Sequence, residues 1–217
     1  TPTLKHSLAG TLCFCLLLGW GLMSGCGSVR QANFYTLATT SSEGANGSHS
    51  EEAIPVVLGI GKFEGGLLYT DDRIIFRDSP YEVKHWHYHR WIAPPNILIS
   101  EQLRDYVRGQ SIVSDVVKFP HYARIPFVLE GRIRNFEELD TANGWQGHVA
   151  FDVVLKNLET EAVVWKSSYE HKEAISEKTP VAVVDALNSA LKTCFERLGT
   201  DLRAALGSST KLCLLYT

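Results

Sequence analysis

Residues 147–156 read GHVAFDVVLK, and apolar and polar side chains alternate along most of this stretch. Successive side chains of a β-strand point to opposite faces of its sheet, so the alternation separates two sets of residues. The apolar set is Val149, Phe151, Val153 and Leu155, and the opposite set is His148, Asp152 and Lys156. Residues 125–134 and 162–171 alternate in the same way. The pattern predicts antiparallel strands with one buried face and one face wetted by solvent.

Further strands are predicted before these segments. The run from Ile54 to Ile60 is apolar and rich in β-branched residues, with glycine near its end, which is typical of a buried strand. Shorter apolar or aromatic segments are also expected to be extended, at residues 33–37, 74–76, 81–91 and 111–119. Asn143-Gly144 and residues 157–160 have the composition of turns between the alternating segments.

Two helices are predicted from apolar residues that recur at helical spacing. Ile99, Leu103 and Val107 follow the Pro94-Pro95 pair at intervals of four, which predicts a helix at 96–108 that ends at Gly109. A cap residue and a proline, Thr179-Pro180, are expected to open the second helix. Its apolar stripe comprises Val183, Ala186, Leu187, Ala190, Leu191, Cys194, Leu198 and Leu202.

Together these elements predict one α+β domain over residues 54–206. Its sheet is expected to be mixed and mostly antiparallel, with two helices packed on one face. Residues 39–53, ATTSSEGANGSHSEE, contain no core-forming side chains and are interpreted as a flexible linker. Residues 207–217 form a tail for which no structure is predicted.

The first 26 residues have the pattern of a lipoprotein signal. Residues 8–25 carry no charge and follow Lys5, and the small residues Ser24 and Gly25 lead into Cys26. The alternative is a permanent transmembrane helix, since 18 uncharged residues can just span a bilayer. The approach to Cys26 resembles a bacterial lipobox, so we predict a signal peptide at 1–25 and lipid attachment, including palmitate, at Cys26. Gly27 and Ser28 then favour the outer membrane, facing the periplasm of a Gram-negative bacterium.

Two cysteines, Cys194 and Cys213, remain after removal of the signal and acylation of Cys26. The periplasm permits disulfides, so a bridge between them is one possibility. Cys194 falls on the apolar stripe of the second helix, which favours a buried, unpaired thiol.

Charge and motifs exclude several classes of protein. The chain has 217 residues, with 21 Lys and Arg against 24 Asp and Glu, so it lacks the excess of basic residues that nucleic-acid binding requires. It contains no P-loop, Gly-x-Ser-x-Gly or paired Cys-x-x-Cys motif, and we predict no enzymatic activity and no cofactor. The adjacent carboxylates Asp71-Asp72 and Glu137-Glu138 are interpreted as solvated surface, because neighbours on a strand point to opposite faces.

Residues 84–91, KHWHYHRW, contain three histidines at alternating positions. In a regular strand, His85, His87 and His89 would share one face, and Trp86 and Tyr88 the other. Imidazole binds zinc, but residues two apart on a strand lie roughly 6.5–7 Å from each other, so one tetrahedral ion rarely takes three. A periplasmic metal site made of these histidines therefore stays the alternative to a structural or partner-facing strand.

The same region resembles a known family. Residues 68–77, LYTDDRIIFR, are similar to its Tyr-Leu-Asp-Arg-x-x-Ile-Val-x-Arg motif, and residues 88–94 to its Tyr-x-x-x-Arg-Trp-Ala-x-Pro signature. Weaker similarity covers most of residues 26–206. The family is that of the ABC-type transport auxiliary lipoproteins. The residues that match, as partner-binding or structural positions, are Tyr69, Arg73, Arg77, Tyr88, Arg90 and Trp91.

The resemblance implies a non-catalytic role in lipid or organic-solvent transport. Members of this family look like outer-membrane components of mammalian-cell-entry-type (MCE) systems. The partners implied are an MCE-domain protein and an ABC permease with its ATPase, and the protein is expected to form a homo-oligomer. Energy would come from the partner ATPase.

Overall fold

The computed structural model describes residues 31–38, 52–142 and 144–214, with side chains as far as Ser208. The predicted signal peptide, Cys26, residues 39–51 of the predicted linker and the side chain of Cys213 lie outside the described residues. All described elements belong to one compact unit that starts at Ala32. No helix in these ranges combines the length and apolar character needed to cross a membrane.

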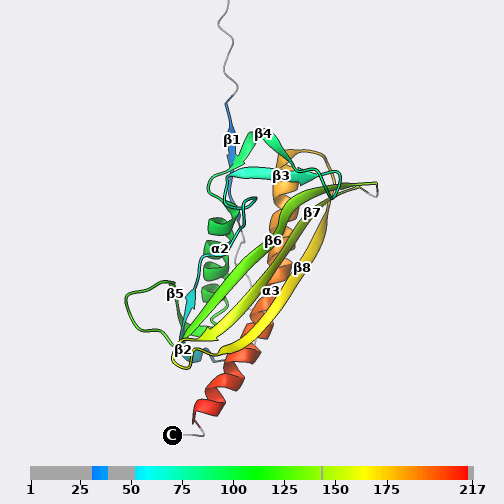
Figure 1. The fold of residues 1–217 in the computed structure, drawn as a ribbon. Coiled ribbons are helices and arrows are strands. Elements are labelled where there is room, and N and C mark those ends of the chain that lie inside the picture. Colours follow the sequence, from blue (N-terminus) through cyan, green and yellow to red (C-terminus); the bar gives the residue numbers. More distant parts are fainter. Residues whose placement is uncertain (1–30, 39–51, 143, 215–217) are drawn as a thin grey trace, which may run out of the picture. The chain divides into compact units, whose positions relative to one another are not determined.

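Eight strands form one mixed sheet that curls around the helices (Figure 1). The strands are β1 (Asn33–Tyr35), β2 (Ile54–Ile60), β3 (Arg73–Arg77), β4 (Lys84–Trp91), β5 (Val113–Lys118), β6 (Phe127–Thr141), β7 (Gly144–Asn157) and β8 (Val163–Ile175). The three long strands β6, β7 and β8 pair antiparallel in sequence order. Strand β3 pairs antiparallel with β4, whereas β1–β4, β2–β5, β2–β6 and β3–β6 are parallel pairs.

The stretch GHVAFDVVLK lies in β7, the middle one of the three long antiparallel strands β6, β7 and β8. Its four apolar side chains are at most 1% exposed and face the helices. At the β6–β7 turn, Gly144 has a φ of 113°, a conformation that favours glycine and permits the tight reversal. The alternating segments are therefore strands, as predicted, although each extends several residues beyond the predicted limits.

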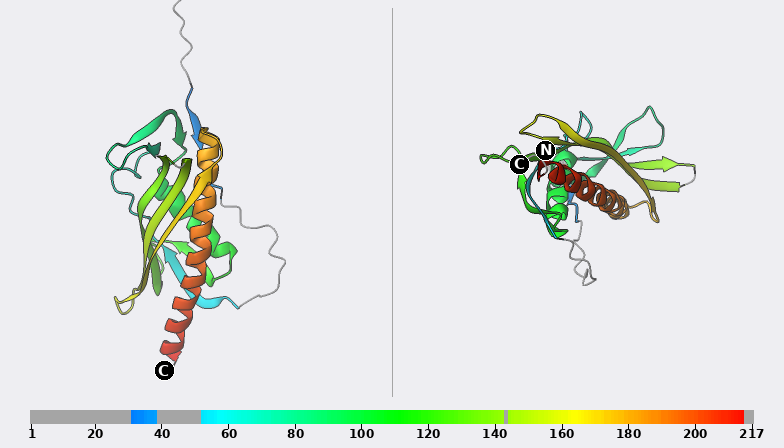
Figure 2. Two further views of the ribbon diagram at one scale, coloured as in Figure 1. Left: turned by 90° about the vertical axis from the view of Figure 1, so that its right-hand side faces the viewer. Right: turned by 90° about the horizontal axis from the view of Figure 1, so that it is seen from below.

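Two helices complete the α+β fold, as predicted. Helix α2 (Pro95–Gly109) has proline at its first turn and lies against β5 and β2. Helix α3 (Pro180–Leu214) runs along the side of β6, β7 and β8 (Figure 2). Both bury their apolar stripes in one continuous core with the sheet. Cys194 is part of that core with a free thiol, and burial raises its pKa to about 11.

A β-bulge in β6 shifts the alternation of that strand by one residue. The register with β7 is interrupted between Ile133 and Asn135, so Ile133 and Phe136 both point to the core although they are three residues apart. Beyond the bulge, Glu137 pairs with His148 on the outer face, and Glu138 pairs with Gly147 on the face toward α3. The bulge thus determines which way the two carboxylates point.

Strand β1 attaches the start of the described chain to the sheet. It pairs parallel with β4, and the Ile92 amide donates to the Tyr35 carbonyl over 2.8 Å. The Ala38 amide then donates to Asn188 Oδ1 of α3 at 3.0 Å. Residues 33–38, which directly precede the predicted linker 39–53, are therefore part of the folded unit.

Candidate functional site

The side chain of Glu137 is the centre of a buried polar cluster. Its Oε2 accepts hydrogen bonds from the Tyr69 hydroxyl at 3.0 Å and from Arg77 Nε at 2.8 Å. Its Oε1 accepts one from Asn135 Nδ2 at 2.9 Å. Glu137 is 1% exposed, so the prediction that it forms solvated surface is wrong. The turn that carries Tyr69 and the end of β3 that carries Arg77 cover it. We call Glu137, Tyr69, Arg77 and Asn135 the Glu137 cluster.

Charge and burial in the Glu137 cluster shift two pKa values. Burial, together with the negative charge of Glu137, raises the pKa of the Tyr69 hydroxyl, which therefore stays protonated and donates. The hydrogen bond that Arg77 donates to the Glu137 carboxylate raises the pKa of the Arg77 guanidinium. One carboxylate thus joins three segments that are far apart in sequence: the turn before β3, β3 itself and β6.

Three other residues of the predicted motif have contacts outside this cluster. Trp91 is 1% exposed, and its ring lies 5.3 Å from that of Phe136. Arg90 forms an ion pair with Asp72 at 2.7 Å, and Arg73 forms one with Asp71 at 3.1 Å. The side chains of both ion pairs are between 34% and 41% exposed. Carboxylates 71 and 72 therefore lie near the surface, as predicted, but each is paired.

Glu138 points to the opposite face and is fully buried. Trp86 Nε1 donates to its Oε2 at 3.0 Å, and its Oε1 has no hydrogen-bond partner among the described residues. Burial raises the pKa of this carboxyl above its usual value of 4.5. The prediction of a solvated side chain is wrong here too, because Trp86 and the sheet cover the end of β6 on this face.

We expect Glu138→Gln to stabilise the protein at high pH. A folded-state pKa raised above the unfolded one means that the wild type loses stability as pH rises through the interval between the two values. Glutamine does not ionise, so its advantage should be near zero at pH 4 and about 1 kcal/mol at pH 8. Urea denaturation at both values measures it. Glu101→Gln, at an exposed position of α2, is the control. An advantage for Glu138→Gln that does not grow with pH would contradict this expectation.

The three histidines of β4 do not meet at one point. The rings of His85 and His87 stack at 5.1 Å with an interplanar angle of 8°. His89 instead bonds through Nδ1 to the Tyr35 hydroxyl at 2.9 Å, and its ring lies 5.8 Å from that of Trp86. Trp86 was expected on the opposite face, so the alternation is broken inside β4. Burial, followed by the charge of Arg73, lowers the pKa of His85. Among the described residues, no three potential metal-binding side chains converge.

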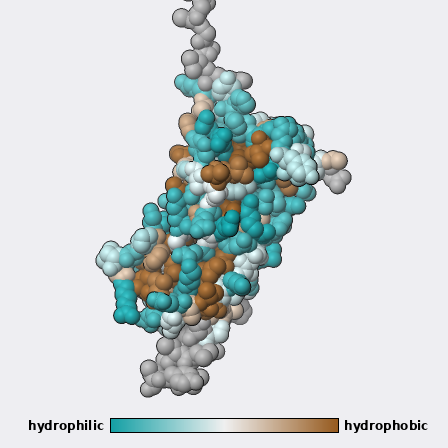
Figure 3. All heavy atoms as spheres, viewed as in Figure 1, coloured by the Kyte–Doolittle hydropathy of each residue, from teal (hydrophilic) through white to brown (hydrophobic). Residues whose placement is uncertain are grey.

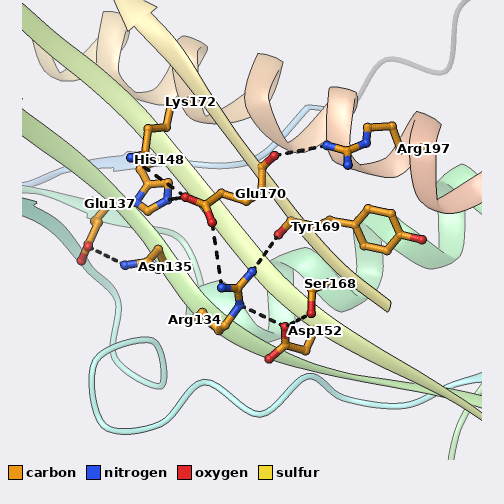
Figure 4. Close-up of polar contacts among 10 residues, drawn as sticks. All are labelled: Arg134, Asn135, Glu137, His148, Asp152, Ser168, Tyr169, Glu170, Lys172 and Arg197. Atoms are coloured by element: carbon orange, nitrogen blue, oxygen red, sulfur yellow. Dashed lines mark hydrogen bonds and ion pairs between the residues drawn. The ribbon is translucent and has the colours of Figure 1, made fainter. Parts of the chain in front are cut away.

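A polar network covers the outer face of β6, β7 and β8 (Figure 4). Arg134 pairs with Asp152 at 3.0 Å, and Asp152 also accepts a hydrogen bond from Ser168 at 2.7 Å. His148 Nε2 lies 2.9 Å from Glu170 Oε1. His148 was expected to be wetted but is 7% exposed, because side chains of the flanking strands cover it, and this burial lowers its pKa.

Two open grooves lie beside the sheet. One, of about 530 Å³, has apolar residues Phe76, Val83 and Trp86 in its wall, with Lys84 and Lys178 among the polar ones. The other, of about 420 Å³, lies between the outer face of β6 and β7 and the loop that contains Phe119. Figure 3 shows apolar side chains gathered near this loop and over β3, set in a mostly hydrophilic surface. Neither groove contains a residue of the Glu137 cluster.

Comparison with known proteins supports the fold. In sequence, the chain matches no protein-family profile and no curated protein. In structure, it is similar to protein XCC0632 from Xanthomonas campestris, of the family DUF330, with a TM-score of 0.74 at 15% identity, over 83% of this chain and 99% of that one. A second crystal structure, of an uncharacterised protein, has a TM-score of 0.62 at 9% identity, over 79% of this chain and 99% of that one.

A putative lipoprotein from Caulobacter crescentus is more distantly similar. Its TM-score is 0.37 at 18% identity, over 52% of this chain and 83% of that one, which is too low to support any argument about function. The comparisons therefore define the class of fold, that of the DUF330 protein. Any argument about the role of the chain has to come from its own residues.

Proposed function

We propose that this protein is a lipid-anchored, non-catalytic auxiliary subunit of an MCE-type ABC system that transports lipids or organic solvents. The observation that carries the proposal is the position of the motif residues. Tyr69 and Arg77 meet on Glu137, and Trp91 is buried against Phe136, the residue before Glu137. Three of the six motif residues therefore make buried contacts, as expected if the chain shares the family's fold.

The predicted lipobox and the fold support the same proposal. Cys26 would attach the mature chain to the outer membrane on its periplasmic side, and the α+β unit would bind protein partners there. The structural similarity to a DUF330 protein agrees with a shared architecture. An MCE-domain protein would be the direct partner, the inner-membrane permease and ATPase would supply energy, and several copies of the chain would assemble.

Affinity capture tests the partner. The full chain with a C-terminal tag is expressed in its own host, envelopes are treated with a reversible cross-linker and solubilised in detergent, and captured proteins are identified by mass spectrometry. We expect an MCE-domain protein at least tenfold enriched over capture with an unrelated tagged outer-membrane lipoprotein. Repeated capture without any MCE-domain protein would contradict the proposal.

A further inference from the structure

The sheet edge formed by β1 and β4 exposes apolar side chains. Phe34 is 60% exposed, Ile92 66% and Tyr88 43%. In the parallel pairing, Phe34 lies beside Arg90, two residues from both Tyr88 and Ile92. Tyr88 and Ile92 are exposed, whereas Trp91, which precedes Ile92, is buried. We call Phe34, Tyr88 and Ile92 the β1–β4 apolar edge.

This edge lies close in sequence to the predicted anchor. Asn33, the first residue of β1, follows Cys26 by seven positions, with six residues between them. An extended chain spans at most about 3.6 Å per residue, so the tether is no longer than about 25 Å. Because β1 is paired with β4, the predicted linker 39–53 follows the edge and adds nothing to this distance. Acyl chains on Cys26 would therefore hold the edge near the bilayer surface.

The composition of the edge suits the headgroup region of a membrane. Residues 84–92 contain no acidic side chain, and Lys84, His87, Tyr88 and Arg90 among them are at least partly exposed, whereas Trp91 is buried. Aromatic and basic side chains are enriched where a bilayer meets water. Acidic groups from neighbouring segments partly offset the charge, since Asp72 pairs with Arg90 and Asp78 with Lys84. Phe34 and Ile92, the most exposed members of the edge, are the side chains that would insert among the headgroups.

We propose that the β1–β4 apolar edge rests against the bilayer that holds Cys26. The inference rests on the proposed lipid anchor and adds to it an orientation: the short tether brings Phe34 and Ile92 into contact with phospholipid. Helix α2 and the β7–β8 turn then extend away from β1 (Figure 1). A second copy of the chain is the competing occupant of this surface.

Photo-cross-linking from a single position tests the contact. Phe34 is replaced by p-benzoylphenylalanine in the full acylated chain, which is reconstituted into vesicles of phosphatidylglycerol and radiolabelled phosphatidylethanolamine. Tyr122, an aromatic residue that is 98% exposed in the loop between β5 and β6, is replaced in the same way as the matched control. Thermal denaturation confirms that both variants are folded. We expect at least fivefold more lipid label on the chain from position 34 than from position 122.

Each outcome is decisive. Equal labelling from the two positions, or no lipid adduct from position 34, would overturn the inference while leaving the anchor intact. An adduct of twice the mass of the chain from position 34 would overturn it in favour of a second copy. Mass spectrometry of the same sample shows whether Cys26 is acylated. An unmodified Cys26 would overturn both this inference and the proposed function.

Discussion

Replacing Glu137 with alanine is expected to lower the free energy of unfolding by about 3–5 kcal/mol. The substitution removes the carboxylate that accepts hydrogen bonds from Arg77 and Tyr69, so both groups are left without this acceptor. Asn135 loses its hydrogen bond as well. Removing one member of a buried ion pair costs far more than removing a pair exposed to water, because the remaining charge has lost its solvent and its partner. The variant should still adopt the fold if the wild type has an ordinary margin of stability, but with a much lower midpoint.

Urea denaturation followed by circular dichroism measures this loss. The matched control is Asp72→Ala, which removes the partner of Arg90 from a pair whose side chains are 37% and 34% exposed. An exposed ion pair contributes about 0–1 kcal/mol, so the control should be only slightly destabilised. Equal losses for the two variants would show that the Glu137 cluster does not hold the motif residues together.

The strands and helices could be predicted from the sequence because their patterns are local. The alternation in residues 147–156 reports burial directly, and the spacing of Ile99, Leu103 and Val107 reports one helical face. Pro95 begins α2 because a missing amide costs nothing in the first turn. The short strand β1 was also predicted, although its pairing with β4 depends on a contact between residues more than 50 positions apart.

The burial of the two carboxylates in β6 was not predicted, because the prediction assumed a regular strand. A signal was present in the sequence: Ile133 and Phe136 are three residues apart, a spacing that requires a bulge if both are to reach the core. Even so, the acceptors of Tyr69 and Arg77 could not be identified from local pattern. The cluster forms only when the turn before β3 and the end of β6 come together, which depends on tertiary packing.

The expectation that the three histidines of β4 share one face was wrong for a related reason. Equal spacing in sequence keeps His85, His87 and His89 on one face only in an uninterrupted strand. Strand β4 pairs regularly with neither neighbour along its full length, and its register with β3 is interrupted between Arg73 and Ile75. His89 consequently lies against Tyr35 and Trp86.

The largest effect that we expect belongs to Cys26, because both the transport role and the membrane-facing edge depend on its acylation. Acyl chains contribute about 0.8 kcal/mol for each buried CH₂, so two or more chains hold a protein on a bilayer durably. A thiol is required for the first acyl group, and neither alanine nor serine can replace it. Cys26→Ala should therefore lose all acyl modification, rather than a fraction of it.

Metabolic labelling with radioactive palmitate in a Gram-negative host measures this loss. The account predicts a labelled wild-type chain, an unlabelled Cys26→Ala variant, and full labelling of Cys15→Ala, whose substituted cysteine lies in the predicted signal peptide. Equal labelling of the wild type and Cys26→Ala would contradict the account, because the protein would then carry no lipid at the residue from which its position at the membrane was inferred.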